Sequence, residues 1–334
     1  MKLDIYNHVF PVAYFDRMQD VIPNKGPIKR WLNIPVLYDI DARLRMMETF
    51  GEYQQILSNS MPPIEFIAGA DVTPGLARLA NDGMADLCRQ HPDRFPGFIA
   101  SLPMNNMDAT LIEIDRSIKE LNACGVQIFS HVNGKPLDEP EFYPLFERMA
   151  QLDKPIWLHP ARGPNHPDYL TEDKSKYEIW WTFGWPYETS VAMARIVFSG
   201  IFDKLPEIKI ISHHLGAMIP YFEGRVGPGW DQLGTRTADE DYGALLASMK
   251  KRPLDYFKMF YADTATFGSA AATDCGLAFF GIDKCLFASD CPFDPEGGPM
   301  YIRETIKILD EIDVTKAERA ALYLDNARTL LKLN

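Results

Sequence analysis

Short apolar strands alternate with amphipathic helices along the whole chain, and this alternation restricts the fold more than any other feature. The predicted strands are residues 3–9, 53–57, 95–102, 125–129, 155–159, 208–213, 259–263 and 285–289. The predicted helices between them include residues 76–88, 109–121, 141–152, 189–199 and 301–312. Repeated strand–helix–strand units indicate parallel strands, and eight of them fit a closed (β/α)₈ barrel, known as a TIM barrel.

The second fold considered is an open, doubly wound sheet. That fold usually carries a glycine-rich phosphate loop after its first strand, and the sequence after residues 3–9 has none. No linker, low-complexity tract or repeat divides the chain. We therefore predict one barrel domain over residues 1–334, with helical insertions, which is a length that single α/β barrels commonly have.

Three long segments depart from the regular pattern, namely residues 11–39, 162–186 and 227–240. In a barrel, long connections that follow strands build the active-site face. Two of the three segments come directly after a strand that carries a histidine. This arrangement predicts a functional site at the carboxyl ends of the strands.

Charge and cysteine content limit the class of partner. The net charge is −12, which disfavours binding to nucleic acid, while a small anionic substrate remains compatible if a metal dominates the field of its pocket. The chain has five cysteines, which is an odd number, and no two of them form a CxxC motif. This pattern is typical of reduced thiols in the cytoplasm. We see no signal peptide and no apolar run that could span a membrane, so we expect a cytoplasmic protein that acts on a small molecule.

Polar residues close the apolar strands at four places. His8 lies near the end of the first strand, His159 ends the fifth, His213 and His214 end the sixth, and Asp290 directly follows the last. The carboxyl ends of parallel barrel strands meet at one mouth, so these side chains are expected to converge. Imidazole and carboxylate together suit a divalent ion such as zinc, manganese or iron.

A single histidine at a strand end is more often a hydrogen-bonded core residue than a metal ligand. The joint pattern of four histidines and one aspartate is poorly explained in that way. The other histidines carry weaker signals. His91 is expected at the surface, and His131 could line the pocket. For His166, exposure to solvent and contact with a substrate are equally expected.

Several of these segments together resemble the amidohydrolase superfamily. They are the first strand with His8, Leu-His-Pro at His159, His-Leu-Gly-Ala-Met-Ile-Pro from His214, Phe-Glu-Gly-Arg at Arg225 and Ser-Asp-Cys-Pro-Phe at Asp290. The resemblance covers nearly the whole chain. More narrowly, it is to the branch of aminocarboxymuconate-semialdehyde, resorcylate and carboxyvanillate decarboxylases.

The resemblance implies a role for each position. His8, His159 and Asp290 would hold one divalent ion, with zinc preferred and manganese as the alternative. His214 would be the catalytic acid or base, because the spacing to the proline six residues later favours it over His213. His213 would then point the opposite way, since neighbouring side chains of a strand alternate. The family also implies a homodimer or a larger homo-oligomer.

The first strand departs from the family pattern of His-x-His or Glu-x-His, because its first position is Tyr6. A phenol with a pKa near 10 is a poor metal ligand unless strongly perturbed. Three interpretations stay open. The metal has only three protein ligands, Tyr6 ligates weakly or binds a metal-bound water, or this branch has lost its metal.

The resulting hypothesis is decarboxylation of an aromatic or unsaturated small acid. A divalent ion would orient the acid and withdraw electron density, while His214 protonates the carbon that loses CO₂. Arg162 and Arg225 could bind a second carboxylate, with a surface salt bridge as the alternative for each. For Arg225 the resemblance favours substrate binding, across a dimer interface. Phe293 is expected near the mouth. The tryptophans of residues 180–185 form either a wall for a ring or a core or dimer contact.

Two rival functions are retained. One is a metal-dependent hydrolase or hydratase, in which Asp290 or His214 serves as the base. The other is a non-catalytic barrel that binds a ligand, with Tyr6 marking the loss of catalysis. Metal analysis combined with an activity screen distinguishes these two functions from the decarboxylase.

Overall fold

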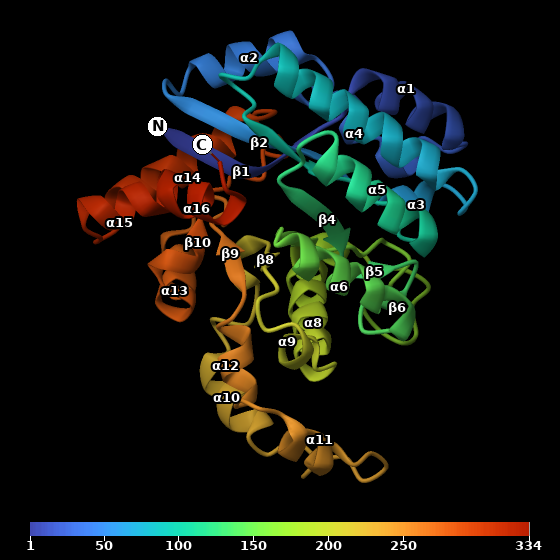
Figure 1. Cartoon of the computed structure of the whole chain (residues 1–334), viewed down its shortest axis with the longest axis vertical. Coiled ribbons are helices and arrows are strands. Elements are labelled where there is room, and N and C mark those ends of the chain that lie inside the picture. Colours follow the sequence, from blue (N-terminus) through green and yellow to red (C-terminus); the bar gives the residue numbers. More distant parts are fainter. Residues whose placement is uncertain (334) are drawn as a thin grey trace.

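Eight parallel strands form one sheet in which sheet neighbours follow the order of the chain (Figure 1). The computed structural model describes residues 1–333, the side chain of Pro27 excepted, so Asn334 of the predicted domain lies outside the described residues. The strands are β1 Lys2–Val9, β2 Tyr53–Asn59, β3 Gly97–Ala100, β4 Gly125–Phe129, β7 Ile156–His159, β8 Ile210–Ser212, β9 Tyr261–Asp263 and β10 Cys285–Leu286. A separate hairpin pairs β5 (His131–Val132) with β6 (Lys135–Pro136).

Backbone hydrogen bonds join β1 to the segment around and after β10. The Ile5 amide donates to the Phe287 carbonyl at 2.9 Å, and the His8 amide donates to the carbonyl of Cys291 at 2.7 Å. In the other direction, the amide of Asp290 donates to the carbonyl of Tyr6 at 3.1 Å. These bonds bring the first and last strands together, so the predicted barrel is confirmed and the open doubly wound sheet is excluded.

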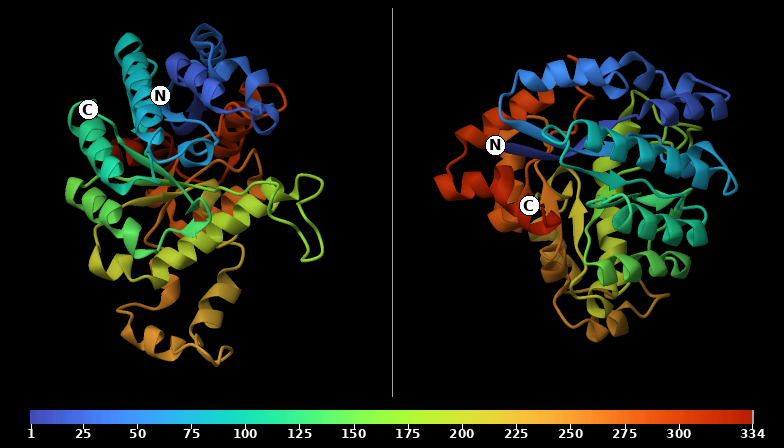
Figure 2. Two further views of the ribbon diagram at one scale, coloured as in Figure 1. Left: turned by 90° about the vertical axis from the view of Figure 1, so that its right-hand side faces the viewer. Right: turned by 45° about the horizontal axis from the view of Figure 1, so that its top comes forward.

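Helices surround the strands, as the two further views in Figure 2 show. They are α1 Val12–Val21, α2 Ile40–Glu48, α3 Ile64–Ile67, α4 Thr73–Gln90, α5 Met107–Lys119, α6 Tyr143–Leu152, α7 Ile179–Thr182, α8 Gly184–Phe198, α9 Ile201–Lys204, α10 Glu223–Trp230, α11 Tyr242–Ser248, α12 Pro253–Phe257, α13 Ala270–Phe280, α14 Pro299–Glu311, α15 Lys316–Ala320 and α16 Asn326–Leu331. Among residues 1–333, none of these helices has the length and apolar character needed to cross a membrane.

Large apolar side chains fill the inside of the barrel, which explains why the strands appear as continuous apolar runs. Ile5, Ile99, Trp157 and Leu286 belong to this inner core, and residues of α16 pack against it. Gly125 is required here, because a Cβ atom at this position would lie 2.7 Å from the Trp157 ring and 2.2 Å from a backbone oxygen. The inside of the barrel is therefore packed with side chains. Within the barrel, an active site is expected at the carboxyl ends of the strands.

Some strands are shorter than predicted, and the difference falls at the functional end. The last predicted strand reached residue 289, but β10 ends at Leu286, and β8 ends at Ser212 before both histidines. His214 and Asp290 have positive φ angles of 56° and 61°, which a strand does not allow. The residues that follow β8 and β10, among them His214 and Asp290, therefore leave the sheet and lie across the mouth of the barrel.

The three long segments carry helices, in agreement with the predicted helical insertions. Residues 11–39 contain α1 and three short 3₁₀ helices, and residues 162–186 contain α7 and the start of α8. Residues 227–230 belong to α10. Together with α11 and α12, α10 extends away from the strands at the bottom of Figure 1.

Candidate active site

His8, His159, His213 and Asp290 come together at the carboxyl ends of β1, β7, β8 and β10. One ligand atom of each residue lies within 4.8 Å of the others, and all four side chains are buried. We call these four residues the histidine–aspartate cluster. The three predicted metal ligands are thus neighbours in space, and His213 joins them.

The hydrogen bonds of His8 fix which of its nitrogens faces the cluster. The Ser58 hydroxyl donates to the carbonyl of Asn7 at 2.6 Å, so its oxygen is free to accept the Nδ1 proton of His8 at 3.0 Å. With the proton on Nδ1, Nε2 carries a lone pair. This assignment, made from the hydrogen-bond network, directs a potential metal-binding atom inward.

The other two histidines of the cluster follow the same rule. Nδ1 of His159 lies 2.6 Å from the Pro160 carbonyl, which can only accept a proton. Nδ1 of His213 lies 2.6 Å from Oδ2 of the buried Asp263 carboxylate. In both rings Nδ1 is therefore the donor, and Nε2 faces inward. Carboxylate or carbonyl partners on the outer nitrogen are typical of histidines that bind metals.

Three buried polar atoms face one another inside the cluster. Nε2 of His8 lies 3.0 Å from Oδ1 of Asp290, and Nε2 of His213 lies 3.6 Å from the same oxygen. Within the described residues, the two nitrogens and this oxygen are buried without a hydrogen-bond partner. Lone pairs this close repel each other unless a proton or a cation lies between them. The donor set of imidazole nitrogens and one carboxylate fits a divalent ion.

The charges of the cluster shift its pKa values in opposite directions. Burial alone would raise the pKa of Asp290, but the close approach of the His213, His214 and His8 rings outweighs it and holds the pKa well below its usual value. Burial, followed by the neighbouring His213 and His8, lowers the pKa of His159 well below its normal range. Burial opposes protonation of His213 as well, but the charge and hydrogen bond of Asp263 raise its pKa to about 9. At neutral pH without a metal, His213 therefore carries a proton on both nitrogens, and a metal at this position would displace the proton on Nε2. Asp290 is therefore an anion that attracts positive charge to the cluster.

His213 does not point away from the mouth, which corrects the expectation from strand alternation. Because β8 ends at Ser212, neither histidine lies in a regular strand, and the left-handed backbone at His214 breaks the alternation. The two rings lie together with centroids 3.5 Å apart. His213 enters the cluster, and His214 lies beside it with Nε2 3.7 Å from Oδ2 of Asp290.

His214 keeps the properties expected of a proton-transfer group. Its side chain is partly accessible, whereas that of His213 is fully buried. Neither ring nitrogen of His214 has a hydrogen-bond partner among residues 1–333. Burial, and then the charge of His213, lowers its pKa below 6.5. A neutral imidazole with free nitrogens at the edge of the cluster can accept a proton and, once protonated, deliver it.

Hydrogen bonds fix the positions of the Tyr6 side chain and of the carboxyl end of β1. The Tyr6 hydroxyl donates to Oε1 of Gln127 at 2.8 Å, and burial, followed by the charges of Asp263 and Asp290, raises the pKa of Tyr6 well above 10. The buried Arg43 guanidinium donates to the carbonyl of His8 at 2.7 Å. Tyr6 is therefore a neutral phenol that points into the barrel.

The predicted substrate-binding residues lie in different places. The Phe293 ring is 5.4 Å from the His8 ring, at the mouth as expected. Arg162 also lies near the mouth, but its guanidinium is paired with Glu188 at 2.7 Å. Arg225 is exposed on α10, so the single chain does not bring it to the cluster.

Aromatic rings line the rest of the mouth. Phe129 and Trp185 approach His159 edge-on, with ring centroids 5.3 and 5.7 Å away. Of the predicted tryptophan wall, Trp185 is the residue that lies beside the cluster. His131 stacks on a phenylalanine 5.4 Å away and lies 6.2 Å from His166, outside the cluster.

Sequence analysis missed Asp263, Gln127 and Phe129, although all three lie next to the cluster. Asp263 ends β9, and its position at a strand end is the one signal that could have identified it. Gln127 and Phe129 lie within an ordinary buried strand and carry no comparable signal.

A model of the amidohydrolase family matches residues 18–333. The chain belongs to the amidohydrolase family. The gamma-resorcylate decarboxylase of Polaromonas sp. is 33% identical to this amidohydrolase over 318 residues, which cover 92% of each chain. The 2-amino-3-carboxymuconate-6-semialdehyde decarboxylase of Dictyostelium discoideum is 30% identical over 277 residues, covering 82% of this chain and 72% of the relative.

Solved structures give the same result. A 2,6-dihydroxybenzoate decarboxylase complexed with 2,6-dihydroxybenzoate has a TM-score of 0.79 to this amidohydrolase and 26% identity, over 99% of both chains. A dihydroxybenzoic acid decarboxylase from Polaromonas sp., with bound manganese and the inhibitor 2-nitroresorcinol, has a TM-score of 0.80 and 28% identity, over 100% of this chain and 97% of that one. These relatives confirm the predicted family, its decarboxylase branch and the enzyme class.

Proposed function

We propose that this amidohydrolase removes CO₂ from a hydroxylated aromatic acid with the help of one divalent metal ion. The observation that carries the proposal is the set of three inward-facing Nε2 atoms around the Asp290 carboxylate, with His214 beside them. The activities named for the relatives support the choice of reaction and of substrate class.

The metal would be held by His8, His159 and Asp290, with His213 as a fourth ligand. His213 would supply the metal ligand that the first strand lacks at position 6. The Tyr6 hydroxyl cannot take that place, because it is neutral and bonded to another side chain. When bound, a divalent ion supplies an anchor for the acid and withdraws electron density from it. Three imidazoles and one carboxylate suit zinc, our first choice, and the manganese bound by a relative supports the second.

His214 would carry the proton that the reaction needs. The electron pair of the broken carbon–carbon bond stays on the ring carbon, which must gain a proton as CO₂ leaves. His214 has free nitrogens and lies at the edge of the cluster, so it can take up a proton from solvent and deliver it to that carbon. Phe293 and Trp185 flank the cluster and would orient the ring. Arg162 could bind a second carboxylate, on the substrate, only after its ion pair with Glu188 is broken.

One experiment tests the reaction. The purified protein is analysed for zinc and manganese, and CO₂ release is measured from a panel of hydroxybenzoates, phthalates and muconate semialdehydes. We expect about one metal ion per chain and CO₂ release from at least one hydroxybenzoate. Cleavage of amides or lactones without CO₂ release would instead favour the hydrolase, and binding of aromatic acids by a metal-free protein would favour the non-catalytic barrel.

We also propose a homodimer or larger homo-oligomer in the cytoplasm. Phe183, Tyr187 and Tyr221 are exposed aromatic residues near the mouth-forming segments, and a second copy would cover them. Arg225 could then reach the site of a neighbouring copy. The five cysteines are unpaired, as a reducing compartment favours. Sedimentation at micromolar concentration and cell fractionation test both points.

A further inference from the structure

The backbone of Asp290 adopts a conformation that residues other than glycine rarely take. Its φ angle is 61°, in the left-handed region, where the Cβ atom of an L-amino acid is crowded. Such a conformation persists only where the surrounding structure holds it. At this bend, Oδ1 of Asp290 lies 3.0 Å from Nε2 of His8. The groups that hold the bend therefore influence the geometry of the histidine–aspartate cluster.

The bend around Asp290 is fixed to β1 through three consecutive backbone amides. The amide of Ser289 donates to Oδ1 of Asp4 at 3.2 Å. The amide of Asp290 donates to the carbonyl of Tyr6 at 3.1 Å. The amide of Cys291 donates to the hydroxyl oxygen of Ser289 at 3.1 Å, and that hydroxyl donates to Oδ2 of Asp4. Asp4 therefore holds both the backbone and the side chain of the residue before Asp290.

The carboxylate of Asp4 is fully occupied by contacts within the protein. It is buried in β1, and besides the two bonds from Ser289 it accepts two others. Oδ1 accepts from the Tyr6 amide at 3.2 Å, and Oδ2 accepts from the Tyr53 hydroxyl at 2.5 Å. Burial raises the pKa of Asp4 to about 6 and these bonds oppose the rise, so the group is mainly ionised at pH 7. Its four donors all come from the protein, which indicates a role in positioning other groups.

A buried network continues from Asp4 to the backbone of His8. The Tyr53 hydroxyl accepts from Nε2 of Gln55 at 2.9 Å, and Oε1 of Gln55 accepts from Nε of Arg43 at 2.8 Å. Nη1 of Arg43 donates to the carbonyl of His8 at 2.7 Å. Each of these five residues is at most 1% exposed. The network therefore links the first strand to the last bend of the barrel, next to two of the cluster residues.

We propose that Asp4 is a positioning residue that, through Ser289, aims the Asp290 carboxylate at the metal. The inference rests on the proposed function, because it takes Asp290 to be a metal ligand. Among residues 1–333, no hydrogen bond joins the Asp4 side chain to the cluster itself, so Asp4 acts through the neighbour of Asp290. Groups that fix a metal ligand in this way commonly alter metal affinity when they are replaced.

The metal affinity of the folded protein tests this role separately from turnover. Dissociation constants for Zn²⁺ and Mn²⁺ are measured by chelator competition on metal-free protein, and circular dichroism checks that each variant is folded. Asp4→Asn keeps the shape of the side chain but replaces one acceptor oxygen by a donor. Ser289→Ala removes the hydroxyl that lies between Asp4 and the amide of Cys291. We expect each substitution to weaken metal binding roughly 10- to 100-fold.

The double variant shows whether the two residues act together. If Asp4 works through Ser289, Asp4→Asn combined with Ser289→Ala should bind metal about as weakly as the more affected single variant. A double variant weakened by the product of the two single effects would show that the residues act independently, and it would overturn the proposal.

Ser117→Ala is the matched control. Ser117 is also a buried serine whose hydroxyl donates to a buried carboxylate, that of Glu113 at 3.2 Å, but it lies on the outer helix α5. The control should lower the unfolding midpoint in urea and leave both dissociation constants unchanged. The proposal is overturned if Asp4→Asn and Ser289→Ala behave like this control, because their role is then only structural.

Two further outcomes keep the test decisive. If Asp4→Asn does not fold, the metal affinity of Ser289→Ala alone decides, since that variant loses a single hydroxyl. CO₂ release is measured separately. A wild type that binds metal without releasing CO₂, with metal affinity lowered in both variants, would contradict the decarboxylase function and support the positioning role of Asp4.

Discussion

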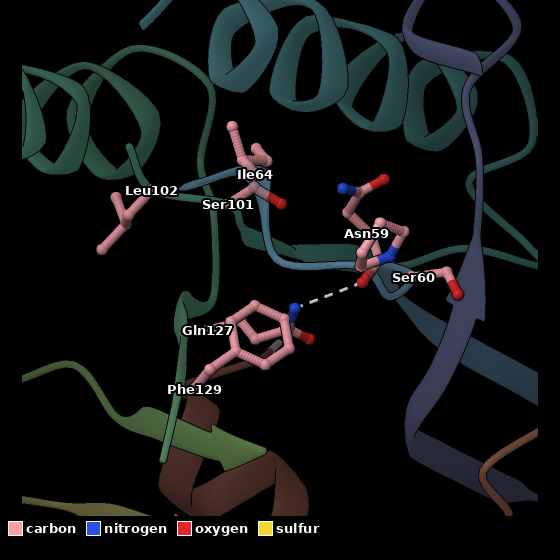
Figure 3. A pocket seen from close by; sticks show the side chains of 8 residues that line it. Asn59, Ser60, Ile64, Ser101, Leu102, Gln127 and Phe129 are labelled. Carbon is pink, nitrogen blue, oxygen red and sulfur yellow. Dashed lines mark hydrogen bonds between the residues drawn. The ribbon is translucent and has the colours of Figure 1, made fainter. Parts of the chain in front are cut away.

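The two sides of the barrel mouth are built from different chemistry. The ends of β1, β7, β8 and β10 contribute the histidine–aspartate cluster, whose rings are each fixed by a hydrogen bond on the outer nitrogen. The ends of β2, β3 and β4 contribute a small uncharged cavity with unpartnered oxygens (Figure 3). It is lined by Asn59, Ser60, Pro62, Ile64, Ser101, Leu102, Gln127 and Phe129. The first side is suited to holding an ion and moving a proton, and the second offers only uncharged groups.

The largest effect should come from breaking the cluster side. Asp290→Ala removes the carboxylate that faces both His8 and His213. We expect loss of the metal and a fall in turnover of about 10⁴-fold or more, because the ion supplies several kcal/mol of charge stabilisation. Elemental analysis, turnover and circular dichroism check this, and the fold should survive. An Asp290→Ala protein that retains a full equivalent of metal would contradict the proposed ligand set.

On the cavity side, Glu65 should make stability depend on pH. Burial raises the pKa of this carboxyl to about 8 from 4.5. The folded protein therefore holds a proton that the unfolded chain releases, so stability falls as pH rises from about 4.5 to about 8. Glu65→Gln should remove this part of the slope and stabilise the protein at pH 8 by roughly 3–4 kcal/mol.

Thermal or denaturant unfolding from pH 4.5 to 8.5 measures the effect of Glu65. The exposed Glu207→Gln variant is the matched control and should follow the wild-type curve. Equal slopes in the wild type and Glu65→Gln would show that Glu65 is ionised in the folded protein.

The two adjacent histidines should separate metal binding from proton transfer. His214→Asn should keep the metal and lose about 10²-fold in turnover, the scale of a lost general acid. His213→Asn should weaken metal binding instead, because it removes an inward nitrogen fixed by Asp263. Metal content and turnover of both variants decide the assignment. Metal loss in the His214 variant, with retention in the His213 variant, would reverse the two roles.

The cluster side was largely predictable from the sequence because its residues are few and conspicuous. Only seven histidines occur in the chain, and His8 and His159 end clear apolar strands. The position of His213 was not predictable, since it depends on where β8 ends and on the left-handed backbone of the next residue. Alternation along a strand applies only while the strand continues.

The cavity side could not be predicted in the same way. Serine and asparagine occur throughout the sequence, and what distinguishes Ser101 and Asn59 is the absence of hydrogen-bond partners, a property of packing alone. The barrel followed from strand–helix alternation. Its closure was predicted from the number of units and the missing phosphate loop, but the backbone bonds between β1 and the residues after β10 that close it are visible only in the structure.

The smallest expected effect concerns Tyr6, which links the two sides through Gln127. Tyr6→Phe removes the hydroxyl that donates to Oε1 of Gln127 at 2.8 Å and leaves a buried acceptor without its partner. We expect a loss of about 1–3 kcal/mol in unfolding free energy. The metal content should stay unchanged, because the four groups of the cluster remain. Tyr169→Phe is the control: Tyr169 is 74% exposed, so the loss of its hydroxyl should cost less. Metal loss in Tyr6→Phe but not in the control would make Tyr6 a ligand, and His213 would no longer be needed to complete the set. Retention of the metal with lower stability would establish Tyr6 as the neutral support that joins the cluster to the cavity.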